Sequence, residues 1–389
     1  MPVAASQTPR VLLLIEAARG FDRGLLSGVA RYARHAGPWT FYRQPHSYLS
    51  RGRRLNIREL RAYRPDGAVC RMDQVQPLKD LGIPLVAYDV NEISADVPQV
   101  VSDDHRAGIL AAEHLLDLGY RSFSFCGYQG LRWSTERGAA FCQRLAEAGY
   151  RADVYPAEKA RRTGWAHEET VVKQWLHDLR KPTGMFCAND DRAASLLETL
   201  RAAGFSVPED VSLLGVDDDY YVCELQNPPL SSVRMASDRA GYDAAALLDQ
   251  MMRGAPPMSG RRLLAPATGV TARQSTSVAI SGNPEIRKAL TFIRENAASL
   301  IRASDVVKAT GISHRALNER FQRELGCPLL ARITRARIGV IARMLTETEL
   351  RVNEIARLVG YDDDQHFARY FKRATGMTPL AYRRRYSPP

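Results

Sequence analysis

From Val11 to about Val216, short apolar runs alternate with longer stretches in which apolar residues recur at helical spacing. The runs have the length of buried strands, and the longer stretches, several of which end in glycine, have the length of helices. The predicted strands are 11–15, 67–70, 84–88, 122–126, 183–187 and 212–216, and the predicted helices include 104–118, 134–148 and 190–203. Such alternation predicts parallel sheets flanked by helices, and its length predicts two α/β lobes.

The pattern changes near residue 274. Residues 274–284 are mostly small and polar and rich in turn-forming types, which is typical of a linker. The residues that follow show helical periodicity only. We therefore predict a two-lobed α/β domain at 10–273, a linker at 274–284 and an all-helical domain at 285–389.

The helical domain contains one short unit twice, at 305–326 and at 354–376. Each copy has a short apolar helix pattern, a glycine at a turn, and a second amphipathic helix that carries a phenylalanine shortly before a closing glycine. The turn glycines are Gly311 and Gly360, and the closing pairs are Phe321 with Gly326 and Phe371 with Gly376. Helix, glycine turn and helix is the form of the helix-turn-helix that reads the major groove of DNA. Two copies predict two consecutive major-groove contacts.

The second helix of each copy presents a polar face opposite its apolar one. Arginine can pair with guanine, glutamine or asparagine with adenine, and glutamate with cytosine, whereas lysine more often contacts phosphate. The predicted DNA-binding residues are Arg315, Asn318, Glu319 and Gln322 in the first copy, and Gln365, Arg369 and Lys372 in the second. Outside a helix-turn-helix such a face would ordinarily be only solvated. A helical stretch of roughly 28 Å at 328–346 separates the copies, close to the roughly 34 Å between successive major-groove faces.

Three acidic residues, 362–364, begin the second reading helix, where they would repel phosphate. Acidic side chains are also favoured at a helix N-terminus, as the N-cap and as partners of the helix dipole. We interpret one of the three as the N-cap and the others as dipole partners.

Charge is unevenly distributed along the chain. The formal net charge is +11, and residues 285–389 hold 20 Lys/Arg against 11 Asp/Glu, while residues 1–284 are almost neutral. A basic end on a neutral body favours a polyanionic partner for that end, although a solvated basic surface would have the same composition. Beside the duplicated unit, this asymmetry favours double-stranded DNA.

The hydrophobic share of 45% and the charged share of 25% are ordinary for a soluble globular protein. The apolar run 11–15 is too short for a signal peptide and meets Glu16, and no stretch is long enough to span a membrane. The cysteines are scattered without CxxC spacing, so neither disulfides nor a zinc site is predicted. We predict a cytoplasmic protein without membrane contact.

The C-terminal region resembles the AraC-type regulators. The second copy carries Ile355, Ala356, Gly360 and Tyr361 in the pattern I-A-x-x-x-G-[FY], and 371–379 matches F-[KR]-[KR]-x-x-G-x-[ST]-P. The closing Tyr382 and Arg383 also match. The resemblance implies two helix-turn-helix subdomains joined by a long helix.

Residues 100–273 resemble the LacI/GalR-type sensors, through VSDDHRAGILAAEHLLDLGYRSFSFCG (101–127), CANDDRAASLLETLRAAGFSVPEDVSLLGVDD (187–218) and PPLSSV (228–233). That family has a periplasmic-binding-like fold of two lobes that close on a small ligand. An AraC-type region behind such a sensor is similar to the bacterial xylose operon regulators, and RWSTER (132–137) and FDRG (21–24) add to this similarity. The resemblance implies a homodimeric regulator on operator DNA, with a sugar effector, D-xylose first, and RNA polymerase as a further partner. Whether it activates or represses stays open.

The family's ligand contacts carry over to polar residues that follow predicted strands, where ligands of open α/β sheets bind. Carboxylates, a carboxamide and an arginine suit sugar hydroxyls, and an aromatic face suits the apolar side of the ring. The predicted ligand residues are Asp22, Trp133, Arg137, Asn189, Asp190 and Asp217. Alternatively, the acidic residues at 217–219 cap a loop, and Trp133 packs between lobes.

An enzyme is the competing class of protein. The glycines Gly20, Gly24 and Gly28 do not follow the dinucleotide pattern GxGxxG. DNA-alkylation repair proteins can carry an AraC-like module, but Cys327 has no histidine beside it to activate a thiolate. We predict no catalytic residue, metal or cofactor. Another effector, such as a nucleobase, a sugar phosphate or a protein, is the remaining alternative.

Overall fold

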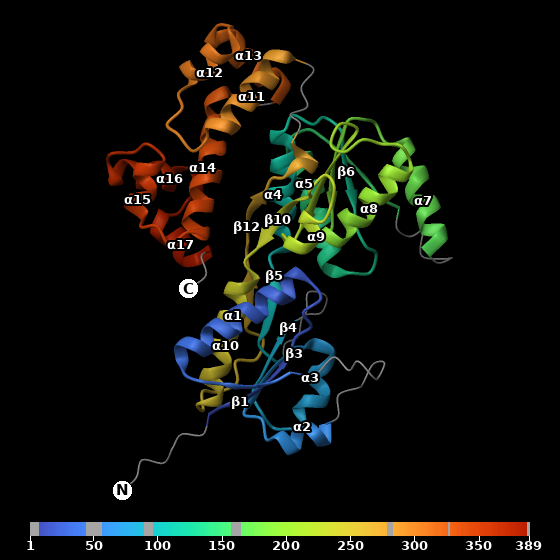
Figure 1. Cartoon of the computed structure of the whole chain (residues 1–389), viewed down its shortest axis with the longest axis vertical. Coiled ribbons are helices and arrows are strands. Elements are labelled where there is room, and N and C mark those ends of the chain that lie inside the picture. Colours follow the sequence, from blue (N-terminus) through green and yellow to red (C-terminus); the bar gives the residue numbers. More distant parts are fainter. Residues whose placement is uncertain are drawn as a thin grey trace. The chain divides into compact units, whose positions relative to one another are not determined.

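The structure, a computed structural model, describes residues 8–43, 57–88, 96–156, 165–277, 283–325 and 327–386 (Figure 1). The chain folds into two compact units. The first unit comprises mainly 1–103 and 236–266, and the second comprises 104–235 and 267–387. The chain therefore passes from one unit to the other after residues 103, 235 and 266.

The first unit is built on a six-stranded sheet in the order β11-β5-β4-β3-β1-β2, in which all neighbours are parallel. Its strands are β1 (Arg10–Leu14), β2 (Thr40–Tyr42), β3 (Gly67–Arg71), β4 (Leu85–Tyr88), β5 (Gln99–Ser102) and β11 (Arg262–Ala265). Its helices are α1 (Gly20–Ala36), α2 (Ile57–Tyr63), α3 (Met72–Lys79) and α10 (Ser237–Met252). Side chains of β1, β3 and β4 pack with Leu60 of α2 and Leu78 of α3 in one buried core. Central parallel strands are buried on both faces, which explains their continuous apolar runs.

The second unit has a six-stranded sheet in the order β12-β10-β9-β8-β6-β7, in which only the pair β10 and β12 is antiparallel. Its strands are β6 (Phe123–Cys126), β7 (Ala152–Val154), β8 (Thr183–Cys187), β9 (Val211–Val216), β10 (Ser231–Met235) and β12 (Ala267–Thr271). The elements around the sheet are α4 (Asp104–Asp117), α5 (Arg132–Glu147), α7 (Trp165–Asp178), α8 (Asp190–Ala202), α9 (Tyr220–Glu224) and the 3-10 helix η1 (Gln274–Thr276). One large core lies between α7, α8 and the strands β8 and β9.

Glycines bring α1 and α10 of the first unit into backbone contact (Figure 1). A side-chain carbon added at Gly28 would lie 1.9 Å from the Asp238 carbonyl oxygen, and one added at Gly241 would lie 2.2 Å from that of Leu25. At Gly24 the neighbour is a side chain instead, because an added carbon would lie 1.9 Å from the Ser237 hydroxyl oxygen. The glycine spacing that does not fit a dinucleotide loop thus fits one face of a helix against a neighbouring backbone.

Substituting Gly28 by alanine is expected to lower the free energy of unfolding by about 1–3 kcal/mol, because α1 must move away from α10. Calorimetric unfolding midpoints measure the effect. The matched control is Gly339→Ala on an exposed helix face, where nothing lies within 4 Å of the added carbon. That control should gain up to about 1 kcal/mol of helix stability. Equal effects of the two substitutions would contradict the close helix contact.

The C-terminal domain consists of helices in two similar groups (Figure 1). These helices are α11 (Pro284–Asn296), α12 (Ala303–Thr310), α13 (His314–Leu325), α14 (Leu329–Glu347), α15 (Val352–Leu358), α16 (Asp364–Thr375) and α17 (Pro379–Tyr386). The first core surrounds Phe321 and includes Ile333 of α14, and the second surrounds Phe371 and includes Ile341 and Leu345 of α14. The long helix α14 therefore joins two subdomains, each with its own core.

The turn glycine of the first copy and the closing glycine of the second end their helices in the left-handed region. Gly311 has φ 77° and Gly376 has φ 77°, and both donate their amides back to the preceding turn. Residues with a Cβ are disfavoured there, so glycine lets the chain reverse directly after each helix. Gly326, predicted to close the first copy, lies outside the described residues.

The predicted fold class, two parallel α/β lobes followed by a double helix-turn-helix, is confirmed. The strand order was not predicted, because α10 and β11 follow β10 in the sequence and yet complete the first unit. Ser275 in the predicted linker is buried, and its hydroxyl donates to the Leu213 carbonyl oxygen at 2.7 Å. The exact domain boundaries stay a prediction.

Candidate functional site

Five of the predicted ligand residues follow three neighbouring strands of the second unit. Trp133 and Arg137 lie on α5 after β6, Asn189 and Asp190 follow β8, and Asp217 follows β9. Because these strands are parallel neighbours, their carboxyl ends meet at one edge of the sheet, where open α/β sheets bind ligands.

Arg137 contacts residues from several elements at this edge. We call Arg137 and its partners Asp104, Trp133, Ala188 and Asp217 the Arg137 cluster. The Arg137 Nε donates to Asp104 Oδ1 at 2.9 Å, and its Nη1 donates to the Ala188 carbonyl oxygen at 2.7 Å. Its Nη2 lies 3.7 Å from Asp217 Oδ1, and its guanidinium lies over the Trp133 ring, 4.9 Å from the centroid. Arg137 is 2% exposed, so most of its donors are already used inside the protein.

The sequence prediction missed Asp104, which holds Arg137 in place. Asp104 is the first residue of α4, directly after the crossing from the first unit, and its side chain is fully buried. The two residues pair at a separation of 33 positions in the sequence. An acidic residue at the start of a helix after a strand was the available signal, but nothing local indicated its partner.

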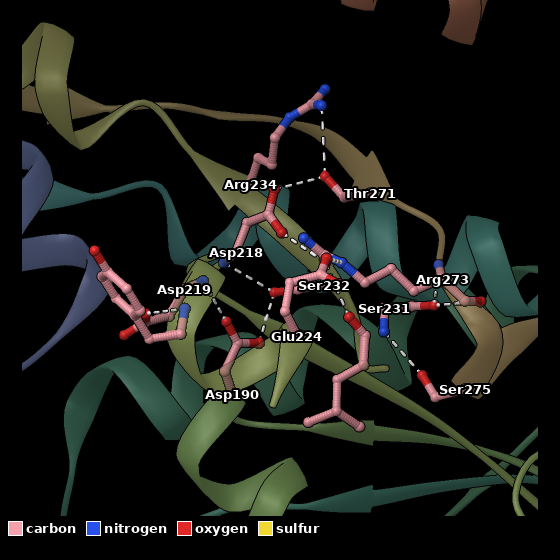
Figure 2. Close-up of polar contacts among 12 residues, drawn as sticks. Asp190, Asp218, Asp219, Glu224, Ser231, Ser232, Arg234, Thr271, Arg273 and Ser275 are labelled. Carbon is pink, nitrogen blue, oxygen red and sulfur yellow. Dashed lines mark hydrogen bonds and ion pairs between the residues drawn. The ribbon is translucent and has the colours of Figure 1, made fainter. Parts of the chain in front are cut away.

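Asp190 is held entirely by protein groups. Its two oxygens accept hydrogen bonds from the Ser232 hydroxyl at 2.6 Å and from the Asp219 amide at 2.8 Å (Figure 2). Burial and the nearby Asp217 raise the pKa of Asp190 well above its ordinary value, although both hydrogen bonds act in the opposite direction. A side-chain carbon at Gly215 would lie 2.1 Å from Asp190 Oδ1, so the strand leaves room for this carboxyl. Asp190 thus supports the loop around Asp217.

Asp217 and Asp218 lie in an unfavourable backbone region. Their φ angles are 104° and 51°, and neither residue is glycine. Such conformations cost of order 1–3 kcal/mol each and persist only when neighbouring contacts enforce them. The side chain of Asp217 is 14% exposed, the most accessible of the charged groups in the Arg137 cluster. Strained, partly accessible carboxylates of this kind are typical of ligand sites.

Asn189 and Trp133 also have internal partners. The Asn189 carboxamide oxygen caps α8 by accepting from the Arg192 amide at 3.0 Å. Trp133 is buried and packs edge-on against Tyr128 in addition to Arg137. Both lie at the predicted edge, and their roles as ligand contacts stay predictions.

Asp22 belongs to the first unit, in the first turn of α1 after β1. Burial raises its pKa to about 6, against the opposing effect of Arg19. Its carboxyl therefore titrates in mildly acidic solution.

The predicted base-reading face of α13 is exposed in most positions. Arg315, Glu319 and Gln322 are exposed, and Arg315 pairs with Glu319 at 2.9 Å along the helix. Asn318 differs, because its carboxamide oxygen accepts from the Leu329 amide at 3.0 Å. That bond satisfies the first amide of α14, a structural role that the helical wheel did not indicate.

The second reading helix, α16, presents its predicted residues fully. Gln365, Arg369 and Lys372 are exposed, while Phe367 and Phe371 are buried. Asp363 is the N-cap, and its carboxylate accepts from the Gln365 amide at 2.7 Å, which lowers its pKa. The interpretation that one of the three acidic residues caps this helix is confirmed.

One arginine of α14 is structural. Arg337 is 3% exposed, donates to the Val359 carbonyl oxygen at 2.6 Å and lies 5.1 Å from the centre of the Tyr361 ring. It joins α14 to the first helix of the second copy and is not presented to a phosphate.

The described ranges of the chain contain no group of three or more histidine, cysteine or acidic residues that could hold a metal ion. Their helices are all too short or too polar to cross a membrane.

Comparisons with known proteins agree with this architecture. Residues 112–276 match the periplasmic binding protein-like domain family, and residues 306–385 match the helix-turn-helix domain family. The xylose operon regulatory protein of Escherichia coli (strain K12) is 30% identical over 385 residues, which cover 96% of each chain. That of Haemophilus influenzae is 26% identical and covers 96% of this chain and 98% of its own.

Solved structures extend the likeness to three dimensions. The structure of the xylose-binding transcription activator XylR is 30% identical, has a TM-score of 0.61, and covers 98% of this chain and 99% of its own. The CelR–cellobiose complex, at 24% identity and a TM-score of 0.52, shares the fold over 69% of this chain and 84% of its own. Because the similarity to the Escherichia coli protein runs through both α/β units and the helix-turn-helix region, the chain belongs to the family of AraC-type xylose operon regulatory proteins, which are transcriptional regulators.

Proposed function

We propose that this regulator responds to a neutral monosaccharide, D-xylose first, bound at the Arg137 cluster. The observation that carries the proposal is the partly accessible Asp217 carboxylate, which lies 3.7 Å from the buried Arg137 at the ligand edge of the sheet. A carboxylate accepts hydrogen bonds from sugar hydroxyls. Trp133 contacts Arg137, and Asn189 follows β8, the strand beside β9. Relatives and a solved neighbour that are named for xylose support the choice of sugar.

The charge at this edge favours a neutral ligand over an anionic one. Arg137 is already paired with Asp104, and carboxyl groups follow β8 and β9 in close succession. A sugar phosphate would bring further negative charge to these groups in a partly buried site, where repulsion is weakly screened. The carboxylate that would face it is Asp217, the most accessible charged group of the Arg137 cluster.

The test is calorimetric titration of the full chain with D-xylose, L-arabinose, D-ribose, D-glucose, a pentose phosphate and a nucleobase. D-xylose is expected to give the strongest binding and to change the affinity for a fluorescent operator fragment. Heat from the nucleobase or the phosphate alone would identify a different effector. Absence of heat and of any thermal shift with every sugar would overturn the proposal.

For DNA, we propose that α13 and α16 enter successive major grooves. The exposed side chains Arg315, Glu319, Gln322, Gln365 and Arg369 would then read bases, with Lys372 on phosphate. Asn318 would serve mainly to hold α14, because its oxygen is already bonded.

We further propose a cytoplasmic homodimer that activates transcription with RNA polymerase, in line with a structural relative described as an activator. The proposed α/β domain then extends from residue 10 through Thr276, since η1 is bonded into the second sheet, and the DNA-binding domain covers 285–389. Asp22 is proposed as a ligand contact on the strength of the family pattern alone.

A further inference from the structure

Arg273 occupies the point where the sensor leaves its sheet. It lies between β12, the last strand, and η1, and the chain continues from there to α11 of the helix-turn-helix domain. The covalent connection from the sensor to the DNA-binding helices therefore runs through this residue.

Arg273 is bonded through both its side chain and its backbone (Figure 2). Its Nη1 donates to Asp218 Oδ1 at 2.8 Å, and its Nε donates to Glu224 Oε1 at 2.6 Å. Its amide donates to the Ser231 hydroxyl at 2.7 Å. The side chains of Arg273 and Asp218 are 13% and 15% exposed, so solvent screens their ion pair only partly.

The other carboxylate oxygen of Asp218 is bound by Thr271, the last residue of β12. The Thr271 hydroxyl donates to Asp218 Oδ2 at 2.6 Å, so the last residue of β12 and Arg273, two positions later, bind the two carboxylate oxygens (Figure 2). The Asp218 amide donates to the Ser232 hydroxyl, which in turn donates to Asp190. We call Asp218, Glu224, Ser231, Thr271 and Arg273 the exit joint.

The exit joint is covalently adjacent to the candidate ligand residue. Asp217 and Asp218 are consecutive, and both have positive φ. A strained pair of this kind has few neighbouring conformations, so a shift of Asp217 on binding must displace Asp218 and its partners Thr271 and Arg273. The second sheet thus offers a short physical path from the ligand edge to the segment that precedes the DNA-binding domain.

We propose that the exit joint transmits effector occupancy to the DNA-binding domain, with Thr271, Asp218 and Arg273 as positioning residues that do not themselves bind the effector. The inference rests on the proposed function, since it takes Asp217 as a ligand contact. Effector and operator binding are then linked by a coupling factor, typically about 5- to 150-fold in allosteric proteins, and this factor is what the joint determines.

The primary test is Thr271→Val in the full chain, which keeps the volume and the β-branched shape but removes the hydrogen bond to Asp218. Operator affinity is measured by anisotropy with and without saturating D-xylose, and D-xylose affinity by calorimetry. The ratio of the two operator affinities is expected to fall toward one, while D-xylose affinity without DNA stays within about threefold of wild type. Asp218→Asn should act in the same direction.

The matched control is Arg144→Gln, which removes an arginine that pairs with Glu113 in the same unit, away from the exit joint. It should keep the wild-type coupling ratio. Arg273→Lys is the second variant should Asp218→Asn fail to fold; because a lysine cannot bond Asp218 and Glu224 through separate nitrogens, it should reduce the ratio partially.

Each outcome separates this inference from the proposed function. A wild-type chain that gives no D-xylose heat would overturn the proposed function itself. A wild-type chain that couples, with Thr271→Val and Asp218→Asn retaining the full ratio, would overturn the exit joint alone. Loss of D-xylose affinity by more than tenfold with an unchanged ratio would show that these residues only support the ligand site, and would also overturn it.

Discussion

Replacing Arg137 by methionine is expected to lower the free energy of unfolding of the second unit by about 3–5 kcal/mol. The substitution leaves Asp104, whose side chain is fully buried, without its charge partner, and leaves the Ala188 carbonyl oxygen without its donor. Breaking a buried pair on one side is costly because the remaining charge stays desolvated. Calorimetric unfolding of the full chain measures the loss.

Two comparisons make this prediction specific. Arg144→Gln removes an ion pair with Glu113 in which both side chains are partly exposed, and it should cost less than about 1 kcal/mol. Adding Asp104→Leu to Arg137→Met removes the orphaned charge and should recover part of the lost stability. A double variant that is less stable than Arg137→Met alone would contradict the role of the pair.

The same variant should separate sensing from DNA binding. Arg137→Met is expected to lose the response to D-xylose, because Asp217 no longer has a cation beside it. Operator affinity without sugar should stay near the wild-type value, since the reading helices have cores of their own. Equal loss of both activities would argue against a ligand-site role for Arg137.

Phe371→Ala should destabilise the second helix-turn-helix subdomain by about 3–5 kcal/mol, because a large, fully buried ring would leave a cavity among Phe367 and Tyr382. Operator affinity should fall strongly as the second major-groove contact is lost, with D-xylose binding unchanged. Circular dichroism on heating and operator anisotropy measure the two effects.

Surface variants on the same helix provide the contrast. Arg373→Ala, at an exposed position, should change stability by no more than about 0.5 kcal/mol. Arg369→Ala should leave the fold intact and cost about 1–3 kcal/mol of operator binding if this side chain pairs with a base. If Arg369→Ala and Arg373→Ala lowered operator affinity equally, and alike on specific and nonspecific DNA, both would be phosphate contacts and the reading assignment would be wrong.

The local pattern of apolar and polar residues was sufficient to predict the strands and helices and the class of fold. The apolar runs predicted β1, β3, β4, β6, β8 and β9 to within two residues at each end, because a strand buried on both faces must be apolar throughout. Helical periodicity predicted α4, α5, α8 and α14 within the same margin. Both signals are local, since they record which face of an element meets a core.

For the ligand edge of the second sheet, the sequence predicted which residues lie there but not what each of them does. Strand ends located Asp217, but the structure assigned its neighbours different tasks: Asp190 supports the loop from within, and Asn189 caps α8. Asp104 was missed altogether. The roles of Asp190 and Asp104 depend on hydrogen bonds to residues 29 to 42 positions away, which no local pattern reveals, whereas the Asn189 cap is local and could have been read from an asparagine that precedes a helix.

The sequence by itself determined the two α/β lobes, the duplicated helix-turn-helix and the residue types at the ligand edge. These features depend on the spacing of buried residues and on the positions of glycines, which are local properties of the sequence. Only the tertiary structure decided the rest. The chain passes between the units three times, Gly28 and Gly241 set the approach of α1 and α10, and Arg273 joins the sensor exit to Asp218. These features depend on strand order, helix approach and side-chain direction, which are set when distant segments pack together.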